Sequence, residues 1–181
     1  NAAHERGEHP AANQSAPAGG GCPGTRMRMP APDAPKVTAT PATNASMPAS
    51  VMPTELQQWP VQLHLVQPGA PFFKNRELAI LSTCSPVASA DVHWRFMRGR
   101  SVVVACPKLD NTDQYVEKLA DILRETTIPK AIIVRMEVPC CGGLTRMVQE
   151  AHRLSGRKDL IVEEVTISPD GNVMATETLN A

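Results

Sequence analysis

The 181-residue chain has few aromatic residues and no surplus of charge of either sign. Phe, Trp and Tyr make up 3% of it, and 18 Lys and Arg balance 18 Asp and Glu. A neutral balance argues against a nucleic-acid or anionic-membrane partner. No apolar run approaches the ~18 residues that a transmembrane helix needs, and no secretory signal pattern is present. We therefore expect neither nucleic acid nor membrane as a partner.

Several well-known catalytic motifs are missing as well. The sequence has no GxxxxGK, no HExxH and no GxSxG. It also has no CxxC pair, which excludes a zinc ribbon and an ordinary ferredoxin loop. Its five cysteines are an odd number without the dense spacing of a secreted disulfide scaffold. Free thiols or metal ligands in a reducing compartment fit better, which favours the cytoplasm and leaves open whether the chain is an enzyme.

The N-terminal third is poor in residues that form a core. Residues 1–53 hold nine of the 17 prolines and only two branched aliphatic residues, Val37 and Val51. Such a segment cannot bury enough apolar area to offset its ordering entropy. We predict a disordered linker or arm over 1–54 and one α/β domain over 55–181. The chain starts at Asn1 rather than Met, which is consistent with a fragment or processed form that lacks an upstream domain.

Apolar runs and amphipathic stretches alternate through the second part of the chain. The helical stretches include 112–126, where apolar residues recur at i, i+3, i+4 and i+7, and one that ends at Gly156. Alternation of this kind predicts βαβ units and a mainly parallel open sheet of four to five strands with flanking helices, a Rossmann-like three-layer arrangement. The expected strands are a short one over 61–66, then 78–83, 101–105, 131–138, 160–167 and an antiparallel edge strand over 172–178.

Cysteines end three consecutive strands of this predicted sheet. They are Cys84, Cys106 and the adjacent pair Cys140 and Cys141. The carboxyl ends of parallel strands meet at one rim, and neighbouring strands lie ~4.8 Å apart. Four converging thiolates suit an iron–sulfur cluster, most simply 4Fe-4S, and suit zinc less well because adjacent cysteines fit one tetrahedral ion poorly. Buried inert cysteines and redox-active thiols are the competing interpretations.

Two glycines follow the cysteine pair and open a helix. Gly142 and Gly143 allow close backbone approach to a ligand. The positive end of the helix dipole favours thiolates or an anionic cofactor at the same place. We therefore predict that both glycines contribute to the cofactor site.

Four strings of the sequence resemble a known family: GGCPG at 20–24, LQQWPVQL at 56–63, CPKLD at 106–110 and VRMEVPCCGGL at 134–144. They are similar to the C-terminal domain of ferredoxin-type 4Fe-4S-binding proteins of bacteria and archaea. The resemblance covers roughly residues 19–171. It implies an N-terminal ferredoxin domain upstream and an iron–sulfur or redox association, with Cys22 and the four rim cysteines as the matching thiols.

Two functions from different classes follow. The first is an iron–sulfur-associated redox or electron-transfer protein, with a cluster or reactive thiols on Cys84, Cys106, Cys140 and Cys141, that exchanges electrons with an upstream ferredoxin domain or a redox partner protein. The second is a non-catalytic docking module that joins a ferredoxin domain to a larger oxidoreductase. A zinc or thiol storage site is a further alternative.

Overall fold

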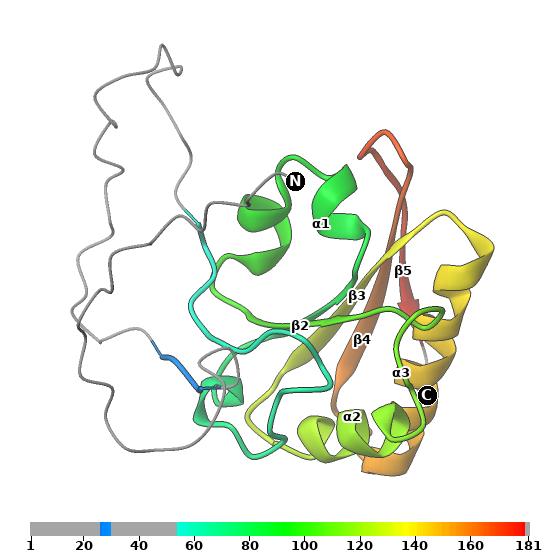
Figure 1. The fold of residues 1–181 in the computed structure, drawn as a ribbon. Helices are drawn as coiled ribbons and strands as arrows, with labels where there is room; N and C mark the ends of the chain where they lie inside the picture. Colours follow the sequence, from blue (N-terminus) through cyan, green and yellow to red (C-terminus); the bar gives the residue numbers. More distant parts are fainter. Residues whose placement is uncertain (1–25, 30–53, 180–181) are drawn as a thin grey trace, which may run out of the picture.

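The computed structural model describes residues 26–29 and 54–179. They form a five-stranded sheet of order β2-β1-β3-β4-β5 (Figure 1). The first four strands are parallel, and β5 is antiparallel to β4. This confirms the predicted mainly parallel sheet and its antiparallel edge. The strands are β1 (Leu78–Ser82), β2 (Ser101–Ala105), β3 (Lys130–Met136), β4 (Ile161–Ile167) and β5 (Val173–Leu179).

Helical segments connect the strands. Two regular helices, α2 and α3, are each strongly amphipathic, and Gly156 ends α3 in the left-handed conformation at φ 73°, as predicted. The predicted helix over 112–126 is shorter than expected, because its first turn begins only at Tyr115. The segments are η2 (Pro71–Phe73), α1 (Ser85–Ala88), the π-helical η3 (His93–Met97), α2 (Tyr115–Leu123), η4 (Pro139–Cys141) and α3 (Gly142–Ser155).

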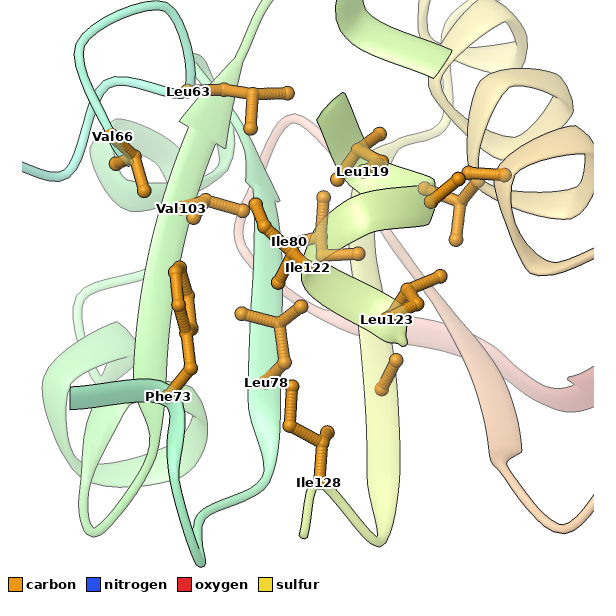
Figure 2. Close-up of a cluster of buried hydrophobic side chains, with 14 of the residues drawn as sticks. Leu63, Val66, Phe73, Leu78, Ile80, Val103, Leu119, Ile122, Leu123 and Ile128 are labelled. Carbon is orange, nitrogen blue, oxygen red and sulfur yellow. The ribbon is translucent and has the colours of Figure 1, made fainter. Parts of the chain in front are cut away.

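Both faces of the sheet are covered, which explains the uninterrupted apolar runs. In β1, Leu78 and Ile80 join a cluster with α2 and α3 (Figure 2). Ala79 and Leu81 point to the opposite face and join a second cluster with η3 residues such as Phe96. All five residues of β1 are buried. The predicted three-layer arrangement is therefore confirmed, with α2 and α3 on one side of the sheet and α1 with η3 on the other.

The strand predicted over 61–66 does not form. Gln62 makes a single parallel bridge to Val104 of β2, and the chain then turns, because the N–H groups of Leu65 and Val66 both donate to the Gln62 carbonyl. The alternating apolar pattern there reflects burial of Leu63 and Val66 in a turn. This segment nevertheless covers the outer edge of β2, since Val104 N–H donates to Val61 O at 2.8 Å.

The β4–β5 turn packs against the end of α1. Gly171 has φ 83°, and a Cβ atom added to it would lie 2.4 Å from the Ala88 carbonyl oxygen. Only glycine fits this contact. The turn therefore lies close to α1 at the end of the sheet where β1 terminates.

Most of the predicted arm over 1–54, and with it Cys22, lies outside the described residues. In the part of the chain that is described, no helix has the length and apolar character needed to cross a membrane.

Candidate functional site

The strand order creates a topological switch point between β1 and β3. From β1 the sheet extends to β2 on one side, and from β3 it extends to β4 on the other. In open α/β sheets, ligands bind in the crevice at the carboxyl ends of such a strand pair. Here residues 82–84 lie at the carboxyl end of β1, and residues 138–141 follow β3. We call these two segments, together with residues 106–110 after β2, the carboxyl rim.

The structure places all four predicted cysteines on this rim, with different exposure. Cys84 and Cys140 are exposed, Cys106 is partly buried and Cys141 is buried. The 3₁₀ turn η4 gives the two adjacent thiols different exposure to solvent. It leaves Cys140 in solvent and turns Cys141 into the apolar cluster on the α1 face of the sheet.

Cys141 lies beside Ser82, the last residue of β1. Ser82 is 1% exposed, and its Oγ is the one buried side-chain polar atom without a hydrogen-bond partner among the described residues. Burial raises the pKa of the Cys141 thiol, while the backbone at Met136 and the Ser82 hydroxyl act to lower that pKa. The Cys140 thiol raises the pKa of Cys141 slightly further. The Ser82 hydroxyl is thus a buried hydrogen-bond donor next to the Cys141 sulfur atom. It can donate to that sulfur when the thiol ionises to a thiolate.

Gly143 brings the β2 loop against the start of α3. A Cβ atom at Gly143 would lie 2.9 Å from Pro107 Cβ, so this glycine serves a close protein contact with the residue after Cys106. At Gly142 an added Cβ would meet nothing within 4 Å. Gly142 instead borders an open hollow of about 470 Å³. The two predicted cofactor glycines therefore have different surroundings, and only Gly142 has space beside it.

Asp110 fixes the loop that carries Cys106. Its Oδ2 accepts hydrogen bonds from the Cys106 N–H at 2.8 Å, from Gln62 Nε2 at 3.0 Å and from the Tyr115 hydroxyl at 3.1 Å. Burial, together with the Asp110 carboxylate, raises the pKa of Tyr115 to about 12. These contacts hold the Cys106 loop at the rim from three directions.

The four thiols share the rim without forming a metal group. Within residues 26–29 and 54–179, no three His, Cys, Asp or Glu side chains are grouped so that they could hold one metal ion. Cys140 and Cys141 are adjacent, and Pro107, the residue after Cys106, lies against Gly143. As the residues lie, their donor set does not fit a cluster bound by all four cysteines.

A model of the Rossmann-like domain family matches residues 70–181. The chain belongs to this family. An uncharacterized protein of Archaeoglobus fulgidus is 35% identical to it over 104 residues, which span 58% of this chain and 73% of that relative. No solved structure matches the chain at a significant level. The family agrees with the observed sheet, and the predicted link to ferredoxin-type proteins stays a prediction.

Two residues of this Rossmann-like domain, Ser82 and Asp110, were not predicted as site residues from the sequence. Ser82 is the one hydroxyl residue in an otherwise apolar strand, LAILS, and a lone polar residue at a strand's carboxyl end was the available signal. Asp110 is the last residue of the CPKLD string at 106–110. Its position four residues after Cys106 allows its carboxylate to reach back to the Cys106 N–H.

Proposed function

We propose that this domain is a thiol-based redox module whose reactive site, the Cys140–Cys141 pair, reduces a disulfide of a redox partner protein. A ferredoxin-type iron–sulfur protein, either upstream in the full-length chain or separate, then reduces the oxidised pair by two single-electron transfers, and the pair takes up two protons. The observation that carries the proposal is the contrast within the pair. An exposed thiol adjoins a buried thiol at the switch point, and the buried one lies beside the unpartnered Ser82 hydroxyl.

The pair is suited to thiol–disulfide exchange. The Cys140 thiolate attacks one sulfur of a partner disulfide, the partner S–S bond breaks, and the released partner thiolate takes up a proton. The Cys141 thiolate then attacks Cys140 Sγ and releases the second partner thiol. The pair is oxidised by two electrons to a disulfide, and the partner disulfide is reduced to two thiols.

Ser82 has a defined task in this sequence. Burial disfavours the Cys141 thiolate, and a hydroxyl that donates to that thiolate offsets part of the cost. Adjacent Cα atoms lie only ~3.8 Å apart, which is shorter than usual for a disulfide. A Cys140–Cys141 disulfide is therefore strained and easily reduced again, as a relay of electrons requires.

This thiol form of the site is favoured over a cluster held by this chain alone, because the described donors do not gather in threes. A cluster on the partner fits the same redox role. A reducing compartment such as the cytoplasm would keep the thiols free.

A second candidate function, docking without chemistry, is favoured by one observation. Val87 and Leu109 are 88% and 83% exposed, and each lies three residues after a rim cysteine. A protein that docks on the rim would cover these two exposed apolar side chains. Docking and exchange are compatible, since an exchange partner must also bind the rim.

Stopped-flow reaction with an aromatic disulfide reagent tests the proposal. Wild type should show a fast phase that Cys140→Ser removes and that Cys84→Ser, a matched exposed thiol on the same rim, leaves in place. Cys141→Ser should retain the fast phase but accumulate a mixed disulfide on Cys140, because the resolving thiol is gone. Equal rates in Cys140→Ser and wild type would refute the proposal.

A further inference from the structure

The π-helical segment η3, which lies between α1 and β2 in the chain, has two sides of different character. π-Helical turns are rare and occur frequently at functional sites. On the inner side of η3, Phe96 and Met97 are buried, and they belong to the same apolar cluster as Cys141. The outer side faces solvent, and Trp94 is 51% exposed there. A large aromatic side chain in this position contributes little to the core.

Arg98 lies over the exposed ring of Trp94. Its guanidinium carbon is 3.8 Å from the centre of the ring, a distance at which a cation–π interaction forms. None of the ion pairs within residues 26–29 and 54–179 involves Arg98. Tryptophan and arginine are the residue types most enriched among the hot spots of protein interfaces. The stacked pair therefore indicates a surface that contacts another protein.

Two further arginines adjoin this pair. Arg95 is exposed and forms an ion pair with Asp91. Arg100 donates through Nη1 to the carbonyls of Arg95 at 3.1 Å and Phe96 at 3.4 Å, and it forms an ion pair with Glu77. We use the name η3 surface for Trp94, Arg95, Arg98 and Arg100. Since only two of its three arginines have a carboxylate partner among the described residues, this surface is positively charged.

The charge of the chain is distributed unevenly around this surface. Residues 26–29 and 54–100, which include β1, α1 and η3, hold seven Lys and Arg and three Asp and Glu. Residues 101–179 hold nine Lys and Arg and twelve Asp and Glu. The balanced total therefore combines a basic part that carries the η3 surface with an acidic remainder. Complementary charge favours an acidic partner at the basic part.

We propose that the η3 surface is the docking surface for the iron–sulfur protein that reduces the Cys140–Cys141 disulfide, and that this partner presents an acidic surface to it. The identity of the partner rests on the function proposed above. A cluster held by four thiolates is anionic, because the thiolates outweigh the charge of the iron–sulfide core. A surface with an unpaired arginine attracts such a partner, and Trp94 supplies apolar contact area.

The position of η3 suits electron transfer to the pair. The inner side of η3 packs in the apolar cluster that contains Cys141, so packed protein connects a partner on the outer side with the buried sulfur. Two electrons, delivered one at a time, break the Cys140–Cys141 bond, and the two sulfurs take up two protons. The exposed Cys140 thiol on the rim stays available for the disulfide partner. The two partners therefore have separate surfaces.

Binding of a purified, acidic two-cluster 4Fe-4S ferredoxin tests the inference. The full chain carries Cys140→Ser and Cys141→Ser in this experiment, so that no thiol chemistry contributes to the result. Calorimetry should show a complex whose affinity falls as sodium chloride rises, because salt screens exposed charges beyond about 10 Å at 0.1 M. Trp94→Ala and Arg98→Glu should each weaken binding by about tenfold or more. Arg98→Lys, which keeps the charge, should weaken it less.

Arg153→Glu is the matched control. It reverses the charge of an exposed arginine on α3, outside the η3 surface, and should leave the affinity within about twofold of the parent. Amide chemical shifts of the labelled chain give a second measurement without substitution in η3. Shifts on titration with the ferredoxin should gather over residues 93–100, and shifts confined to the carboxyl rim would contradict the proposed surface.

Three other results would overturn the inference. They are the absence of a complex at low salt, an Arg98→Glu or Trp94→Ala variant that binds as tightly as its parent, and a single-stranded oligonucleotide that binds this surface more tightly than the ferredoxin does. Failure of this inference is distinguishable from failure of the redox proposal. Loss of the complex with an intact fast reaction of Cys140 would refute the docking surface alone, and a complex without that reaction would refute the redox proposal alone.

Discussion

The buried hydroxyl of Ser82 meets the thiol of Cys141 across the carboxyl ends of β1 and β3, the two strands that flank the switch point. The hydroxyl has no hydrogen-bond partner among the described residues, and unsatisfied buried polar groups are rare in folded proteins. In the proposed exchange chemistry, this hydroxyl would stabilise a Cys141 thiolate that forms only during reaction.

Ser82→Ala separates stability from reactivity. Loss of an unsatisfied hydroxyl should raise the free energy of unfolding by about 1 kcal/mol. The same change should raise the pKa of Cys141 further, because the hydroxyl is one of the groups that lower it. Urea unfolding and thiolate absorbance, the latter in a chain whose other cysteines are serine, measure the two effects. A lower stability together with an unchanged Cys141 titration would show that Ser82 has only a packing role.

The Gly143–Pro107 contact predicts an asymmetry between adjacent glycines. Gly143→Ala places a methyl group 2.9 Å from Pro107 Cβ and should lower the free energy of unfolding by about 1–3 kcal/mol. Gly142→Ala is the matched control. Its new methyl group enters open space in a helix, so stability should stay the same or rise by up to about 1 kcal/mol. Equal effects of the two substitutions would contradict the contact.

Tyr115 predicts a loss of stability at alkaline pH. Its pKa is about 12 in the folded protein and 10.0 without the burial and the Asp110 carboxylate that raise it. Below pH 10 the Tyr115 hydroxyl is protonated in both the folded and the unfolded state, and its contribution to the free energy of unfolding is complete. That contribution is lost as pH rises through about 12, because Tyr115 ionises at a lower pH in the unfolded state than in the folded state. A shift of this size corresponds to about 3 kcal/mol.

Tyr115→Phe checks that assignment. It should lower stability at neutral pH, through loss of the hydrogen bond to Asp110, by about 1.5–3 kcal/mol. The free energy of unfolding, measured with urea between pH 8 and 11, should then fall less steeply with pH than it does in wild type. An alkaline decline of the same steepness in the phenylalanine variant would assign the effect to other groups.

Among residues near the surface, Arg157 should give the largest loss of stability when alanine replaces it. Its side chain is 8% exposed and donates to the carbonyls of Leu123, Glu125 and Ile128 as well as to Asp159. Arg157→Ala leaves these carbonyls without their donor, and we expect a loss of about 3 kcal/mol. Arg153→Ala, which breaks the exposed pair with Glu150, should change thermal unfolding little. Similar effects of the two substitutions would refute the structural role of Arg157.

The sequence predicts the sheet well because local pattern and tertiary burial agree there. β1 reads as a continuous apolar run, and both of its faces are covered in the structure. The segment over 61–66 misleads because its alternating pattern buries Leu63 and Val66 in a turn. Period alone does not distinguish a strand from a turn whose apolar residues point inward.

The sequence predicts where in the fold the candidate site lies, but it does not predict how the side chains of the site are arranged. Parallel strands bring Cys84, Cys106 and Cys140 to one rim, which follows from topology alone. The separation of an exposed Cys140 from a buried Cys141 depends on the 3₁₀ turn η4, and the role of Ser82 depends on which strands are neighbours. Both are tertiary properties that no motif in the sequence records.

The most direct test of the central claim is a joint assay of iron, acid-labile sulfide, zinc and reactive thiols per chain on protein purified without oxygen. The account predicts neither stoichiometric metal nor sulfide on this chain. It predicts alkylation of Cys84 and Cys140 in the folded protein, and of Cys141 only on unfolding or exchange. About four irons and four sulfides, with the rim cysteines protected, would contradict it and establish a cluster on the rim instead.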